Sequence, residues 1–444
     1  MTVSVHCGTF EAERYWRDLD LAVLPSLTDR SNKPIVDAMD EMLFAFCMHG
    51  DSLLTRGGMD KSHYDYLQSL GFRFKTNLHP LNPIFSPLSD PNIFQLLNDS
   101  GTSTPDELQT LLPEGARIEP FAVLPGAIET IQRYRLSSTL PHEDDVCRVN
   151  SKIYSVMMRE RLGIPNIGEV IEHPDQLLSK GMRLLERGSL LIKDDYGVSG
   201  KGNMQIDSER TLQRLVSYLS SQVDRGKRMQ FVLEPLVDRG SDFSCQFRLN
   251  VNGSFNLISL QQLRNVGYAY DGSYSADPSL FELLVSTGYF ELMERIGALL
   301  NKDGYYGDVC VDSMLLRDGK IEPLVEINAR KSMSLIKHYM DRYFEREDLK
   351  GCLTQVNVIS SQPGNFSDVL ERLEDTGILF AQSKGSGIIP LTSGTLFPRT
   401  NVNASGVYKG RLYAAIGYRT EEDLQNLSEG MKEVLIEYGL KLVV

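Results

Sequence analysis

The sequence of 444 residues contains no run of 18 apolar residues, the length that a membrane-spanning helix needs. Its first residues, MTVSVHCGTFEAERYW, reach acidic side chains too early for a secretory signal peptide. Basic residues are in the minority, since 46 Lys and Arg against 59 Asp and Glu give a net charge of −13. This excess of acid disfavours nucleic acid or an anionic membrane as the main partner. We therefore expect a cytoplasmic protein that binds neither.

Zinc-binding and disulfide patterns are also missing. The six cysteines lie far apart with no C-x-x-C pair, and the seven histidines show no H-x-x-x-H spacing. In a chain of this length, scattered cysteines indicate reduced thiols rather than a disulfide framework or a zinc site. Cys245 and Cys310 fall inside strand-like segments, so we interpret them as core residues and not as nucleophiles.

The chain is long enough for two or three domains, and we find no internal repeat or low-complexity tract. Residues 1–140 form the first predicted unit, which includes an amphipathic helical run at 33–50 with an apolar face of Ile35, Met39, Met42 and Leu43. The character of the sequence changes at residue 150. A helix is predicted there that begins at Asn150 or Ser151 and stops at Gly163, with an apolar face of Ile153, Val156 and Met157.

Residues 192–203, IKDDYGVSGKGN, read as a glycine-rich loop that leaves a strand. Backbone N–H groups in such a loop can approach phosphate oxygens. The loop is not a Walker A motif, because Gly200 and Lys201 are followed by glycine, and its glycine spacing does not fit G-x-G-x-x-G. Taken alone, it is as compatible with a plain surface hairpin as with a phosphate site.

A later segment, YYGDVCVDSMLLRDGKIEPLVEINAR, predicts two strands joined at Asp318-Gly319. Because residues two apart on a strand share a face, Glu326 and Asn328 should point to one side and Val325 to the other. Folding at the turn would bring Asp312 beside Glu326 and Asn328. Such oxygen ligands suit Mg²⁺, which takes the rest of its shell from water and nucleotide phosphates.

The glycine-rich loop at 192–203 and the later hairpin with Asp312, Glu326 and Asn328, in this order along the chain, resemble the ATP-grasp superfamily over about residues 145–345. In that family two α+β subdomains grip ATP, and the usual product is an acylphosphate that an amine or another nucleophile attacks. The resemblance implies an α+β, ATP-grasp fold in three parts. These are an N-terminal α/β pre-ATP-grasp domain at 1–140, the ATP-grasp domain at 141–350 with its lid at about 164–230, and a small C-terminal α+β appendage at 351–444.

The same resemblance implies roles for the matched residues. ATP would be bound by Lys152, Lys193, Gly197, Ser199, Gly200, Lys201, Gly202, Glu234, Leu236, Val237 and Asp242. Mg²⁺, which Mn²⁺ can replace, would be bound by Asp312, Glu326 and Asn328. Arg330 would neutralise charge on the transferring phosphoryl group and Lys193 would contact the adenine and the α-phosphate; both are predicted catalytic residues.

The chain departs from the family pattern at two places. Many relatives carry an arginine where this chain has Cys310, so Arg248 or Arg264 would fill that electrostatic role, and Arg264 is kept among the predicted catalytic residues. Pro235 follows the hinge residue Glu234 and lacks an N–H group, so the adenine contacts must come from its neighbours.

We predict a carboxylate–amine ligase that forms an amide or peptide bond through an acylphosphate and releases ADP and phosphate. Its substrates would be small-molecule or peptide acids and amines. One alternative is the loading of an amino acid onto a carrier-protein thiol, and another is a non-catalytic nucleotide-binding regulator. The flanking parts resemble the peptide-ligase and carrier-protein-ligase branch of natural-product pathways. Residues 382–398 either line the acceptor pocket or form a connector. The acid, the amine and the oligomeric state stay open.

Overall fold

The computed structural model describes residues 2–25, 32–81, 90–99, 105–197, 202–266, 269–383, 385–398 and 407–443. Three predicted lid-loop residues, Ser199, Gly200 and Lys201, lie outside these ranges. No helix in the described ranges is long and apolar enough to cross a membrane.

The N-terminal part is built on a parallel sheet, as expected for an α/β unit. Among the described residues its strand order is β3-β2-β1-β4, formed by Lys75–Thr76, Ser52–Leu54, Ser4–Cys7 and Arg117–Pro120. Its helices are α1 (Glu13–Trp16), α2 (Lys33–Asp37), the 3-10 helix η2 (Ala38–Phe46), α3 (Lys61–Ser69), α4 (Ile93–Asn98), α5 (Pro105–Leu111), α6 (Ala127–Arg133) and α7 (Glu143–Val149). The amphipathic run at 33–50 is therefore α2 and η2, and its predicted apolar face is buried.

Helix α8 (Lys152–Leu162) begins and ends where the sequence predicts. The hydroxyl of Ser151 caps it by accepting from the Tyr154 N–H, and Gly163 ends it in the left-handed conformation with φ 70°. Its predicted apolar face is partly wrong, because Met157 is 52% exposed while Met158 is fully buried. The helix contacts both the lid strands and the central sheet, so it buries polar residues as well as apolar ones.

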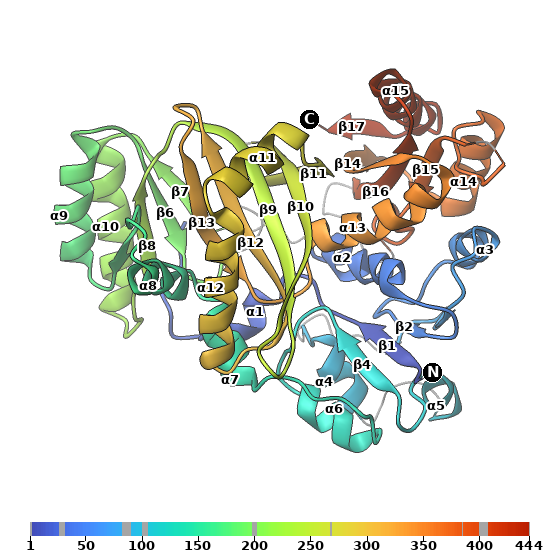
Figure 1. Ribbon diagram of the computed structural model, residues 1–444, viewed down its shortest axis with the longest axis horizontal. Helices are drawn as coiled ribbons and strands as arrows, with labels where there is room; N and C mark the ends of the chain where they lie inside the picture. The colour runs from blue at the N-terminus through green and yellow to red at the C-terminus, as the bar shows by residue number, and fades with distance from the viewer. Residues whose placement is uncertain are drawn as a thin grey trace.

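A separate antiparallel sheet falls within the predicted lid region. Among the described residues its order is β5-β8-β6-β7, formed by Glu169–Ile171, Phe231–Pro235, Leu190–Asp194 and Asn203–Ile206. Helices α9 (Pro174–Leu185) and α10 (Glu209–Val223) cover its outer side, at the left of Figure 1. Their leucines and those of the strands form a core of their own, which also takes in Ala22 and Leu24 from the N-terminal part.

The largest sheet runs through the middle of the molecule (Figure 1). Within the described ranges its order is β13-β12-β9-β10-β11-β14-β16-β15, formed by Ile321–Asn328, Gly307–Leu316, Arg239–Leu249, Phe255–Val266, Ala269–Ser275, Lys350–Ser360, Tyr408–Tyr418 and Gly387–Pro390; β17 (Lys441–Val443) pairs with β14. A turn at Asn252-Gly253 joins β9 to β10, and the predicted turn at Asp318-Gly319 joins β12 to β13. Two helices follow β11, α11 (Pro278–Ser286) and α12 (Tyr289–Lys302), and Gly288 separates them by adopting φ 70°.

The C-terminal part continues this central sheet, since β14 pairs with β11. It nevertheless has its own apolar core, formed with helices α14 (Phe366–Asp375) and α15 (Glu421–Glu437). Helix α13 (Met333–Phe344) and the short η3 (Glu345–Glu347) connect β13 to β14. The segment after β13 therefore leads directly from the predicted metal ligands into the C-terminal part.

Candidate active site

A cavity of about 590 Å³ is lined by residues of the lid sheet and of the central sheet. We call it the nucleotide cavity. It brings together most of the residues that the sequence singles out, from segments almost 180 positions apart. These are Lys152, Lys193, Gly197, Glu234, Leu236, Val237, Asp242, Asp312, Glu326, Asn328 and Arg330.

The hairpin of β12 and β13 holds the predicted metal ligands at one end of this cavity. Asp312 lies opposite Glu326 in the strand register, and its Oδ2 accepts a hydrogen bond of 2.9 Å from Asn328 Nδ2. Val325 also lines the cavity, contrary to the strict alternation predicted from the sequence. The pairing jumps from Asp312 with Glu326 to Met314 with Glu322, and this bulge in β13 breaks the period of two.

The electrostatics of this hairpin suit a divalent cation. Burial, followed by repulsion from Glu326, raises the pKa of Asp312 to about 7. A cation between the two carboxylates would relieve that repulsion, and the amide oxygen of Asn328 is a further hard ligand. The described residues contain no group of three or more His, Cys, Asp or Glu that could hold a metal.

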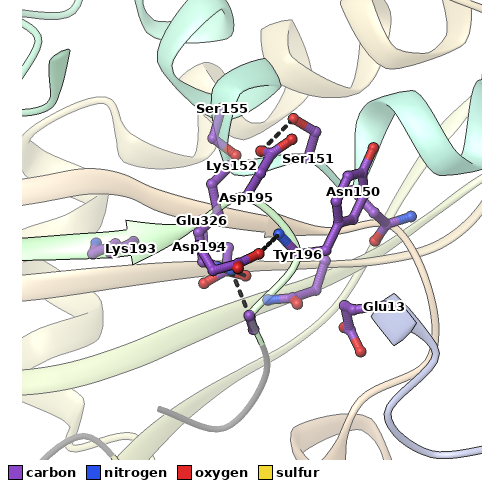
Figure 2. Close-up of polar contacts among 12 residues, drawn as sticks. Glu13, Asn150, Ser151, Lys152, Ser155, Lys193, Asp194, Asp195, Tyr196 and Glu326 are labelled. Carbon is purple, nitrogen blue, oxygen red and sulfur yellow. Dashed lines mark hydrogen bonds and ion pairs between the residues drawn. The ribbon is translucent and has the colours of Figure 1, made fainter. Parts of the chain in front are cut away.

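Lys152 reaches the same end of the cavity from the start of α8. Figure 2 shows its ammonium group pointing toward Glu326, with Nζ 3.0 Å from Oε1, and it also donates to the Gly197 carbonyl at 2.6 Å. Burial alone would lower the pKa of Lys152, but the surrounding carboxylates, Glu326 foremost, together raise it. Asp195 fixes the start of this helix, because its Oδ1 accepts from Ser151 Oγ at 2.6 Å.

Lys193 lies on β6 and pairs with Glu234 of β8, with Nζ 2.5 Å from Oε2. Both side chains are buried. The Leu236 N–H already donates to the Ser189 carbonyl at 2.8 Å, so it is engaged within the lid. Because Pro235 has no N–H, the hinge groups that remain for an adenine ring are the Leu236 carbonyl and the backbone of Val237.

Asp242 presents an unsatisfied acceptor at the cavity wall. Its Oδ2 accepts from Asn265 Nδ2 at 2.5 Å and lies 3.1 Å from Arg239 Nη1. Its Oδ1 is buried and has no hydrogen-bond partner within the described part of the chain. Burial raises the pKa of Asp242. A ligand hydroxyl would satisfy the second oxygen, which agrees with the ribose-binding role implied by the resemblance.

Arg330 is held by a residue that the sequence reasoning missed. Its Nε donates to Glu13 Oε1 at 2.9 Å, and its Nη2 donates to Asn328 Oδ1 at 3.0 Å. The guanidinium group also lies over the Phe121 ring, with 5.5 Å between Cζ and the ring centroid. Burial would lower the pKa of Arg330, but the neighbouring groups, Glu13 foremost, together raise it. No local pattern marks Glu13, because it lies 317 positions from its partner.

Asn150 is a second residue with an unforeseen role. The sequence offers it only as a helix cap, a role that Ser151 takes. Its side-chain amide instead clamps the backbone of Ala329, since Oδ1 accepts from the Ala329 N–H at 2.9 Å and Nδ2 donates to the Ala329 carbonyl at 3.3 Å. This fixes the chain between Asn328 and Arg330.

The structure does not bring every predicted residue to the cavity. Arg264, predicted among the catalytic residues, lies outside the lining, pairs with Asp271 at 2.6 Å and covers the Tyr274 ring. Its neighbours Leu263 and Asn265 line the cavity, so strand alternation turns Arg264 away. Arg248, the other candidate, pairs with Asp308 at 3.3 Å, also away from this lining.

Gly202 and Cys310 are two further residues that the sequence singles out. Gly202 lies outside the cavity lining and closes the loop with φ 89°. Cys310 lines the cavity as a core thiol, because burial raises its pKa to about 12.

The segment 382–398 was expected either to line the acceptor pocket or to form a connector. Its described residues are not part of the lining of the nucleotide cavity. Instead the N–H of Gly394 donates to the buried carboxylate of Glu41 at 2.9 Å. The segment thus joins the C-terminal part to the N-terminal part.

Comparison with known proteins places this geometry in context. No family model matches the chain. A [butirosin acyl-carrier protein]–L-glutamate ligase from Niallia circulans is 26% identical over 317 residues, covering 69% of this chain and 67% of that protein. An ADP complex of N5-carboxyaminoimidazole ribonucleotide synthetase superposes with a TM-score of 0.54 at 11% identity, covering 98% and 97% of the two chains. A β,γ-ATP complex of biotin carboxylase from Campylobacter jejuni gives a TM-score of 0.55 at 11% identity, covering 100% and 92%.

The two solved structures confirm the ATP-grasp fold that the sequence predicts. The curated relative is itself a ligase. These likenesses agree with the prediction of an ATP-dependent ligase, which is argued from the site below.

Proposed function

We propose that the chain binds ATP and Mg²⁺ in the nucleotide cavity and activates a carboxylic acid by transferring the γ-phosphoryl group to it. One observation carries this proposal. Two lysines, an arginine and a facing pair of carboxylates, from four separate segments, line a single cavity between the lid and the central sheet. Phosphoryl transfer to a carboxylate brings anions together, so the site must supply positive charge and fixed geometry.

Each residue has a defined task in this proposal. Asp242 would accept from the ribose and the hinge at 236–237 would contact the adenine, which places the phosphates toward Lys152 and Lys193. Asp312, Glu326 and Asn328 would hold Mg²⁺, which supplies charge neutralisation at the phosphates. Arg330, fixed by Glu13 and Asn328, would orient the incoming carboxylate and the transferring group.

For the acid we propose an amino acid, and for the acceptor an amine or a carrier-protein thiol. The named relative is a carrier-protein–glutamate ligase, which supports both an amino-acid substrate and the thiol alternative. A second cavity of about 400 Å³ includes Arg330 and opens between the N-terminal part and β12. It offers the acceptor a route to the activated acid that is separate from the nucleotide.

The products distinguish this mechanism from adenylation. Adenylation attacks the α-phosphate and releases pyrophosphate, whereas the charges gathered near Asp312 and Arg330 favour chemistry at the γ-phosphate. We expect ADP and phosphate in equal amounts when the protein is mixed with Mg-ATP, a panel of amino acids and hydroxylamine. Hydroxylamine should trap the activated acid as a hydroxamate. AMP and pyrophosphate as the stoichiometric products would refute the proposal.

A further inference from the structure

A third cavity, of about 300 Å³, adjoins the nucleotide cavity. The two share Tyr270, Arg330 and Met333 in their linings, so they meet at the arginine that faces the transferring phosphoryl group. We call the third one the Arg411 cavity. Its remaining lining comes from the N-terminal part, including Glu11 and Met39, and from the C-terminal part, including Gln355, Arg411 and Tyr413. All three parts of the chain therefore build it.

Arg411 is the cation that distinguishes this cavity. Its Nε donates to Asn357 Oδ1 at 2.7 Å and its Nη1 donates to the Tyr413 hydroxyl at 2.8 Å, and both partners are neutral. No carboxylate of the described residues forms an ion pair with it. A guanidinium group has five N–H donors, so the edge that includes Nη2 is left for a ligand.

The surroundings hold Arg411 in place. The Tyr413 hydroxyl donates in turn to Met39 Sδ at 3.4 Å, and the backbone N–H of Arg411 donates to the Thr395 carbonyl at 2.8 Å. A cation fixed by neutral groups and facing a cavity is preorganised for a carboxylate, which it can bind through two parallel hydrogen bonds.

The second cavity, near Arg330 on the other side, lacks such a group. Its cations already have acid partners, because Arg248 lies 3.3 Å from Asp308 and Lys331 lies 3.7 Å from Glu119. Arg117 also pairs with Glu119, at 2.7 Å. The Arg411 cavity is therefore the better receptor for an additional anion.

Glu11 adds a negative group to the Arg411 cavity. Its backbone has φ 57°, a left-handed conformation that is uncommon for a residue other than glycine and is often found at functional sites. Its carboxylate lies 3.6 Å from Arg14 at the N-terminal side of the cavity. The lining thus combines one carboxylate with two separate guanidinium groups, those of Arg330 and Arg411.

We infer that the Arg411 cavity binds the acid substrate and selects an amino acid with two carboxylates. This inference rests on the function proposed above. One carboxylate of the amino acid would lie at the reacting position beside Arg330 and the other would bind Arg411. The ammonium group of the amino acid would lie on the side of Glu11. The cavity size fits a small polar ligand.

The test compares dicarboxylic amino acids with their amides in the same assay. Full-length protein is mixed with Mg-ATP, hydroxylamine and glutamate, aspartate, glutamine or asparagine, and ADP and hydroxamate are measured. We expect the wild type to prefer a dicarboxylic acid over its amide by about ten- to a hundredfold in kcat/KM, because the amide lacks a charge-assisted contact. Arg411→Gln should remove most of that preference by raising KM for the acid, with KM for ATP unchanged.

Two further variants control for folding and for general loss of charge. Arg411→Lys keeps the charge and should retain part of the preference. Lys432→Gln, at an exposed position of α15, removes a charge from the same part of the chain away from the cavity and should behave like wild type. The inference would be overturned if the preference for the dicarboxylic acid survived in Arg411→Gln. It would also be overturned if ADP were released only with monocarboxylic acids. Either result would leave the proposed ligase function standing. Release of no ADP with any acid would overturn both.

Discussion

The buried pair of Glu13 and Arg330 gives the sharpest test of how the site is held. The side chain of Glu13 is 5% exposed and that of Arg330 is 11% exposed, so little water screens their interaction. In Glu13→Gln the side chain keeps its size and one acceptor oxygen but loses its charge. The guanidinium group of Arg330 then stays buried without its counter-ion.

The magnitude follows from the contact. Two unit charges about 4 Å apart attract by about 4 kcal/mol at an effective dielectric constant of 20. Part of that attraction offsets the cost of burying the carboxylate, and a charge-assisted hydrogen bond is worth about 1.5–3 kcal/mol net. We expect the free energy of unfolding to fall by about that amount. A guanidinium group free to rotate should also lower kcat about tenfold, while ATP affinity holds because the lysine contacts persist.

Chemical denaturation and ADP-release kinetics measure the two effects on the same samples. Glu114→Gln is the matched control, because Glu114 pairs with Arg135 at 3.5 Å where both side chains are at least 70% exposed. Exposed pairs contribute little, so this variant should unfold and turn over like wild type. If Glu13→Gln did the same, Glu13 would not position Arg330 and the reasoning would be wrong.

The remaining predictions concern the metal and the phosphates. Glu326→Gln should keep the fold but lower turnover by at least about a hundredfold, because the amide holds Mg²⁺ weakly. If the variant melted like wild type and kept near-full activity, Glu326 would not be a metal ligand. Lys152→Ala and Lys193→Ala should each weaken ATP binding by about ten- to a hundredfold in calorimetry, since each loses a charge-assisted phosphate contact. Lys180→Ala, which removes a lid contact with Glu169 and with the Val170 carbonyl, serves as their control. Unchanged affinity in both test variants would contradict the phosphate assignment.

Local patterns in the sequence were sufficient to predict the hairpin that carries the proposed metal ligands. The Asp-Gly turn fixes where the chain reverses, and strand alternation then puts Asp312 opposite Glu326. The same alternation failed at Val325, because a bulge is set by how the strand packs and leaves no mark in the local pattern. At Arg264 alternation holds and turns the side chain away from the cavity, which a role inferred from charge alone did not take into account.

Contacts between distant segments were beyond the sequence. Asn150 reads as a helix cap, yet its amide clamps the backbone beside Arg330. Glu13 sits in an unremarkable helix turn, and only the docking of the N-terminal part on the central sheet gives it a partner. Such pairs need the tertiary fold, because no periodicity relates residues that far apart in the chain.

Those long-range contacts change how nucleotide binding should be understood. Lys152 pairs with Glu326, Lys193 with Glu234 and Arg330 with Glu13, so each predicted phosphate-binding cation in the described ranges already has a carboxylate. Phosphate oxygens must therefore compete with these partners, which limits the gain from binding nucleotide alone. A divalent cation held by Asp312 and Glu326 would weaken the hold of Glu326 on Lys152 and release that ammonium group for phosphate. Metal and nucleotide should consequently bind as a unit, with each raising the affinity for the other.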